Sequence, residues 1–86
     1  MTGKLAISKS GHDKDHLYVI VKEDADFVYL ADGVLKLVDN PKKKNKKHIQ
    51  IIKQIPEEIA SYIQKEAFLD LEIKRAIKLF KTQKDA

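Results

Sequence analysis

The chain has 86 residues, of which 43% are hydrophobic and 35% are charged, and its formal net charge is +4. A chain of this size forms one small domain, and its apolar content is sufficient for folding. Its longest uninterrupted apolar run, residues 17–21, is far shorter than the roughly 20 residues that a membrane-spanning helix needs. Cysteine is absent, which excludes disulfides and thiolate metal sites, and no secretory signal is recognisable, so we expect a cytoplasmic protein without membrane contact.

Five segments have the two-residue alternation and the β-branched or aromatic content of strands. They are residues 4–9, 16–23, 27–32, 34–38 and 48–53. The pair Asp32-Gly33 is typical of a two-residue hairpin turn, because the favoured turn needs positive φ at both central positions. Five short strands joined by tight turns predict a small antiparallel barrel.

The second half of the chain has the period of helices. Pro56 followed by Glu57 and Glu58 is typical of a helix start, since proline has no N–H to satisfy and carboxylates favour the positive end of the helix dipole. Asp70 is a plausible N-cap for a second helix. The pattern favours two helices, and one long helix over residues 56–81 is the alternative.

Apolar residues occupy both faces of the predicted strands. Tyr18, Ile20, Val28 and Leu30 are apolar at positions where strict alternation would place polar groups. We expect the C-terminal helices to cover these side chains, so that residues 1–55 and 56–86 share one core. The predicted fold class is therefore mainly β with C-terminal α, a five-stranded barrel packed against one or two helices.

The positive charge is concentrated in one segment. Residues 1–40 carry five lysines against seven acidic residues, residues 56–86 are balanced, and residues 41–55 carry six lysines and no acidic residue. Five of these lysines lie in a predicted loop over residues 41–47, the lysine-rich segment. Such a concentration indicates a polyanionic partner. The alternatives are a solvated loop that only aids solubility and a nuclear-import signal.

Two stretches resemble a known family. KLAISKSGHDKDHLYVIV resembles the KOW motif of ribosomal proteins and transcription elongation factors, and ADGVLKLVDNPKKKNKKHIQ is similar to small KOW-domain RNA-binding proteins related to a class of large-subunit ribosomal proteins. Together they cover about half of the chain. The resemblance implies an SH3-like barrel and RNA binding in translation, without catalysis. The family tends to have glycine where Asp15 stands and arginine where His12 and His16 stand.

The expected RNA contacts come from the KOW-like loop and from the lysine-rich segment. They are Lys9, Ser10, Gly11, His12, Lys14, Lys42, Lys43, Lys44, Lys46, Lys47 and His48. The expected partner is RNA, in particular ribosomal RNA, bound by a monomer without cofactor, metal or small-molecule substrate. No arrangement of nucleophile and base predicts an enzyme. The alternative function is a protein-interaction module that uses the barrel or the helical face.

Histidines and aromatic residues leave further alternatives. His12 and His16, with Asp13 and Asp15 between them, have the composition of a metal site but are expected to be ordinary surface residues. His48 fits the edge of a strand or an RNA contact. The aromatic residues Tyr18, Phe27 and Tyr29 could stack on bases, but their position in strand patterns favours the core.

Overall fold

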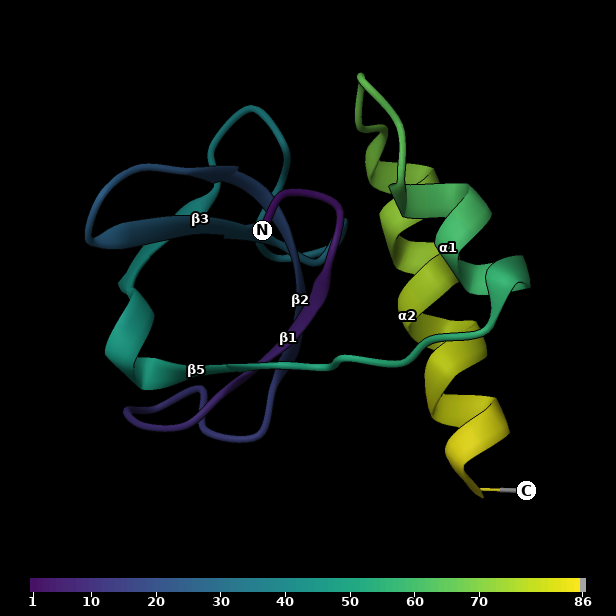
Figure 1. The fold of residues 1–86 in the computed structure, drawn as a ribbon, viewed down its shortest axis with the longest axis horizontal. Coiled ribbons are helices and arrows are strands. Elements are labelled where there is room, and N and C mark those ends of the chain that lie inside the picture. The colour runs from purple at the N-terminus through teal and green to yellow at the C-terminus, as the bar shows by residue number, and fades with distance from the viewer. Residues whose placement is uncertain (86) are drawn as a thin grey trace.

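A computed structural model describes residues 1–85, so Ala86, the last residue of the predicted helical segment, lies outside the described residues. The elements are β1 (Leu5–Ser8), β2 (Leu17–Glu23), β3 (Phe27–Ala31), β4 (Lys42–Asn45), a 3₁₀ turn (Lys46–His48), β5 (Ile49–Ile51), α1 (Glu57–Ile63) and α2 (Asp70–Asp85). Both helices lie on one side of the curved sheet (Figure 1). The predicted order of five strands followed by two helices is confirmed, although one of the five strands is a different segment from the one predicted.

The strands form one antiparallel sheet in the order β4-β3-β2-β1-β5. Lys44 on the edge strand β4 donates from Nζ to Ser8 Oγ on β1, at 2.7 Å. Three strand spacings separate β4 from β1, about 14 Å in a flat sheet, which is beyond the reach of a lysine side chain. The sheet therefore curls enough to bring its edge strand β4 toward β1, which is compatible with the predicted barrel.

The predicted strand over residues 34–38 is wrong. Asp32 Oδ1 accepts hydrogen bonds from the backbone N–H groups of Val34, Leu35 and Lys36, each at 2.9 Å. These N–H groups are therefore turned toward a carboxylate and cannot pair with another strand. Gly33 has a φ of +78°, as a turn requires, but the turn opens a loop that leads to Pro41, and no hairpin strand follows it.

The prediction of a loop over residues 41–47 is also wrong. Lys42–Asn45 is the fourth strand, β4, and it pairs with β3. Three consecutive lysines are tolerated because β4 is an edge strand, where charged side chains are common and discourage pairing with other chains. Lys46 and Lys47, the last two lysines of the segment, begin the 3₁₀ turn, and His48 belongs to this turn and not to the fifth strand.

Each face of the sheet has its own apolar cluster. The inner face carries Ala6, Tyr18, Ile20, Val28, Leu30 and Ile49. The outer face packs against the helices, and the cluster there consists of Leu5, Leu17, Val19, Ala31, Ile59, Ile63, Ile73, Ala76 and Ile77. The helices do cover one face of the sheet, as predicted, but the side chains they cover are not Tyr18, Ile20, Val28 and Leu30, which face inward. Alternation cannot tell which of two apolar faces is turned toward a helix.

Helix α1 begins as predicted, with Pro56 before Glu57 and Glu58, but α2 begins one residue earlier than predicted. The backbone N–H of Ile73 bonds to the carbonyl of Leu69, so Leu69 and not Asp70 occupies the capping position of α2. Asp70 instead accepts a hydrogen bond on Oδ1 from the backbone N–H of Val38, at 2.8 Å, and so anchors the loop between β3 and β4 to α2.

Within residues 1–85, no helix has the length and apolarity required to cross a membrane.

The helix-facing cluster predicts a difference between two positions on α2. Ile73→Ala should lower the free energy of unfolding by about 2–5 kcal/mol, because it removes a fully buried side chain and leaves a cavity. Chemical denaturation followed by circular dichroism measures this change. The control is Leu71→Ala, two positions earlier and 66% exposed, which should change stability by less than about 0.5 kcal/mol. Equal effects of the two substitutions would contradict the assignment of the core.

Candidate nucleic-acid interface

A buried ion-pair cluster occupies one end of the inner face of the sheet. The carboxylate of Asp13 accepts hydrogen bonds on Oδ1 from Ser8 Oγ and Lys44 Nζ, and on Oδ2 from Tyr18 OH and Lys42 Nζ, at 2.8–2.9 Å. Lys44 Nζ also donates to the carbonyl of Ser10 at 2.8 Å. Only 13% of the Asp13 side chain and 10% of the Lys44 side chain is exposed. Lys44 therefore forms part of the interior, whereas Lys42 lies at its edge with 31% of its side chain exposed.

The strand register explains why two lysines point inward. Lys42 lies opposite Leu30 and Lys44 opposite Val28 in the pairing of β4 with β3. Directly opposed residues project to the same face, and Leu30 and Val28 belong to the inner cluster. Alternation then places Lys43 and Asn45 on the outer face.

Ionisation of Asp13 is strongly favoured in the folded protein. Burial by itself raises the pKa of this carboxyl, but the hydrogen bonds from Lys42, Lys44, Ser8 and Tyr18 outweigh burial and hold the pKa far below its usual range. The same contact acts on the phenol: burial and the hydrogen bond to Asp13 raise the pKa of Tyr18 above its usual value. The cluster thus has one carboxylate for two ammonium groups.

This arrangement changes the expected set of RNA contacts. Lys42 and Lys44 are engaged by Asp13, and Lys46 pairs with Glu23 at 3.0 Å on the surface. Only Lys43 and Lys47 of the lysine-rich segment are exposed, together with the neighbouring His48. Periodicity within a lysine run could have separated these two sets, had the segment been read as a strand.

The uncovered part of the outer face combines lysines with aromatic rings. Lys22, Tyr29 and Lys43 lie directly opposite one another on β2, β3 and β4. The register of β2 and β3 shifts between Ile20 and Lys22, and this bulge turns Lys22 outward, away from the face that Ile20 occupies. Lys22, Phe27, Tyr29 and Lys43 make up this surface, which we call the aromatic–lysine face.

Lysine ammonium groups lie over both aromatic rings of this face. Lys43 Nζ is 4.3 Å from the centre of the Phe27 ring, and Lys22 Nζ is 5.3 Å from that of Tyr29. These distances are in the range of cation–π attraction. Asp24 also lies here and accepts a hydrogen bond from Tyr29 OH at 3.1 Å, so the face carries two positive charges and one negative charge.

The aromatic residues divide between core and surface. Tyr18 is 3% exposed and belongs to the core, as predicted, but to the inner cluster and not to the one under the helices. Phe27 and Tyr29 are half-buried and belong to neither apolar cluster, so their assignment to the core is wrong. The sequence signal that could have separated them is alternation, which places Phe27 and Tyr29 on the strand face opposite to Val28 and Leu30.

The loop between β1 and β2, which carries the KOW-like stretch, contributes exposed basic side chains and backbone groups. Lys9, His12 and Lys14 are exposed, and the backbone N–H of Lys9 bonds to the carbonyl of His48 at 2.8 Å, which joins this loop to the 3₁₀ turn. Ser10 uses its carbonyl for Lys44. Gly11 has a φ of +87° and lies beside this contact.

Asp15 adopts a backbone conformation that glycine takes most easily. Its φ is +71°, and it is the only residue other than glycine with positive φ in the described part of the chain. Aspartate tolerates this conformation better than most residues. The loop therefore turns at the position where the resembling family tends to have glycine.

His16 is fixed away from the exposed part of the loop. Its Nε2 lies 2.8 Å from Asp32 Oδ2 and donates to this carboxylate. Burial raises the pKa of Asp32, but hydrogen bonds from backbone N–H groups and from His16 outweigh it, so the pKa is lowered. Among residues 1–85, no group of three or more His, Asp or Glu side chains could hold a metal ion, and His12 and His16 do not form one.

Comparison with known proteins gives no assignment. No protein-family model matches the chain, and no curated protein matches it at a significant level. Function is therefore inferred from the residues and their geometry.

The Asp13 cluster predicts a specific loss of stability. Asp13→Asn should lower the free energy of unfolding at pH 7 by about 2–3 kcal/mol, because two largely buried lysines are deprived of their counter-charge. The folded-state pKa of Asp13 is lowered, so its contribution is complete above the unfolded pKa of about 4 and declines as pH falls below it. The difference between parent and variant should therefore shrink below about pH 4.

Denaturation curves measured between pH 7 and pH 2 check this expectation. The matched control is Asp15→Asn, an exposed carboxylate on the same loop whose replacement also tolerates positive φ. A pH-independent difference between Asp13→Asn and the parent would mean that the charge of Asp13 does not stabilise the fold.

Proposed function

We propose that this protein is a non-catalytic RNA-binding module that holds single-stranded RNA on the aromatic–lysine face. The observation that carries the proposal is the row Lys22, Tyr29 and Lys43, in which a half-exposed ring stands between two lysines. Aromatic rings stack on unpaired bases, and lysines beside them neutralise the phosphates that connect those bases. RNA bases would stack on Phe27 and Tyr29.

Further exposed cations extend this surface along the chain. Asn45, opposite Phe27, accepts a hydrogen bond from the backbone N–H of Lys47, so Lys47 follows the aromatic–lysine face directly. His48 and Lys9 come next through their backbone hydrogen bond. An RNA strand bound across the aromatic–lysine face would continue along these side chains toward His12 and Lys14.

The resemblance to KOW-domain proteins supports the same partner. An open five-stranded antiparallel sheet, a loop between β1 and β2 with Gly11 and Asp15 at positive φ, and an adjoining basic segment agree with what that resemblance implies. We therefore propose an SH3-like barrel that acts on ribosomal RNA or on the translation apparatus in the cytoplasm.

The proposal separates the lysines into two groups with different roles. Replacing Lys22, Lys43 and Lys47 by Gln should leave the fold unchanged and weaken binding of single-stranded RNA by about tenfold or more. The slope of log K against log salt should become shallower by about 0.7 for each RNA phosphate that the variant no longer neutralises. Fluorescence anisotropy with a labelled RNA over a range of salt concentrations measures both quantities.

A matched control removes the same charge from another surface. Lys74, Lys78 and Lys81 are exposed on α2, and their replacement by Gln gives the same net charge. If both triple variants weaken RNA binding equally, binding follows net charge alone, and the proposed face is wrong.

Stacking is tested separately from charge. Tyr29→Leu and Phe27→Leu should each weaken single-stranded RNA binding by about tenfold, because a leucine has no flat face for a base. Their salt slopes should stay at the parent value, since every lysine that neutralises a phosphate is still present. Undiminished affinity in both variants would show that RNA does not stack on this face.

A further inference from the structure

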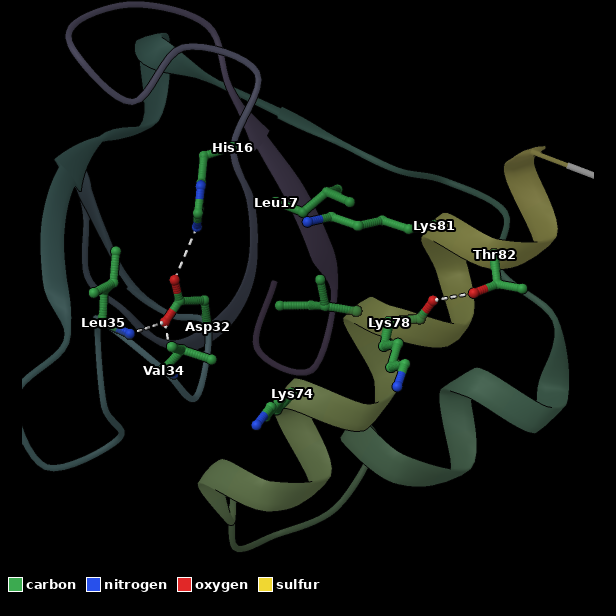
Figure 2. A pocket seen from close by; sticks show the side chains of 10 residues that line it. His16, Leu17, Asp32, Val34, Leu35, Lys74, Lys78, Lys81 and Thr82 are labelled. Atoms are coloured by element: carbon green, nitrogen blue, oxygen red, sulfur yellow. Dashed lines mark hydrogen bonds and ion pairs between the residues drawn. The ribbon is translucent and has the colours of Figure 1, made fainter.

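A groove separates α2 from the loop that follows β3. Its volume is about 390 Å³, and its apolar lining comes from Leu17, Val34, Leu35 and Ile77. Val34 is 58% exposed and Leu35 is 78% exposed. Figure 2 shows these two side chains on the wall opposite α2. Two aliphatic side chains are therefore largely exposed to solvent beside an apolar groove, and no described part of the chain buries them.

The wall that carries these side chains is held in place. Asp32 bonds to three consecutive backbone N–H groups of the loop, and Asp70 bonds to the N–H of Val38. A Cβ on Gly33 would lie 2.3 Å from the carbonyl oxygen of Asp70, so loop and helix touch at this position. A wall fixed at both ends loses little entropy when a ligand binds.

The opposite wall is positively charged. Lys74, Lys78 and Lys81 line the groove from α2, and Figure 2 shows Lys81 reaching toward Leu17. No described acidic side chain pairs with any of the three. The single acidic residue of the lining, Asp32, is already satisfied by His16 and by backbone N–H groups.

We propose that this groove binds an acidic amphipathic peptide helix of a partner protein, with carboxylates on the three lysines and aliphatic side chains against Val34 and Leu35. The positions of Lys74, Lys78 and Lys81 follow the i, i+4, i+7 spacing of one helix face and span about 10.5 Å. A partner helix packed along α2 presents acidic residues with the same spacing. The groove volume is at the lower end of the range for specific pockets, enough for a few side chains.

The chemistry of the lining distinguishes this occupant from RNA. Recognition of unpaired bases uses aromatic rings or arginine planes for stacking. The lining has no arginine, and its one aromatic ring, the imidazole of His16, is held by Asp32; the apolar part of the lining consists of leucine, valine and isoleucine. Aliphatic side chains pack on such a surface, and positive charge beside it selects carboxylates. The groove and the aromatic–lysine face have no residue in common, so the two proposals stand independently.

The experiment measures binding of a fluorescent synthetic peptide to the full chain. The peptide is a helix of about 18 residues with glutamates at i, i+4 and i+7 and a neighbouring stripe of leucines at i+1, i+5 and i+8. Replacing Lys74, Lys78 and Lys81 by Gln should weaken its binding by about tenfold or more, and Leu35→Ser by about tenfold. Peptides with Gln for Glu, or with Ala for Leu, should bind about tenfold more weakly than the parent peptide.

Two control variants make the result specific. Leu71→Ser changes a 66% exposed leucine of α2 that does not line the groove, and the Gln triple variant of Lys22, Lys43 and Lys47 removes equal charge elsewhere. Both should bind the peptide within about twofold of the parent. The proposal is overturned if the parent chain does not bind the peptide at about 1 mM, or if test and control variants weaken binding equally.

A parallel titration with single-stranded RNA separates this proposal from the proposed function. Weaker RNA binding by the Lys74, Lys78 and Lys81 variant, with peptide affinity unchanged, would assign the groove to RNA and overturn the peptide site. Weaker peptide binding with unchanged RNA affinity in this variant supports the groove proposal. RNA binding on the aromatic–lysine face is then decided by the Lys22, Lys43 and Lys47 variant.

Discussion

The contact of Asp13 with Lys42 and Lys44 is the interaction on which the curled sheet depends. It joins the loop between β1 and β2 to the edge strand β4, across the inner face. The cost of burying charge is offset because each carboxylate oxygen accepts from a lysine and from a hydroxyl group. This contact also decides the surface: it withdraws two lysines from solvent and, through strand alternation, turns Lys43 outward to Phe27.

The helices then divide the outer face of the sheet into two parts. Where α1 and α2 pack, Leu5, Val19 and Ala31 are buried. Beyond the helices the same face carries lysines and aromatic rings, and the bulge in β2 adds Lys22 to them. A domain this small has little apolar surface to spare, so half-buried aromatic side chains outside both apolar clusters are more informative about function than the basic composition is.

Loop 32–38 connects the sheet to α2 through hydrogen bonds to two carboxylates, as the Asp13 cluster connects β4 to the loop between β1 and β2. Asp32 folds the backbone around its own carboxylate, and Asp70 receives the other end of the loop. The result is a fixed wall that exposes Val34 and Leu35 opposite the lysines of α2. The protein thereby offers two chemically different surfaces, one with aromatic rings and lysines and one with aliphatic side chains and lysines.

The sequence by itself determined the elements whose signals are local. Alternation located β1, β2, β3 and β5 to within about two residues, and the helical period located both helices, because side-chain periodicity depends on neighbours in the chain. Only the tertiary structure decided what residues 34–38 and 42–45 become. Three backbone N–H groups turn to the Asp32 carboxylate in the first segment, whereas the lysines of the second become a strand because Asp13, about thirty positions away in sequence, pairs with both inward side chains.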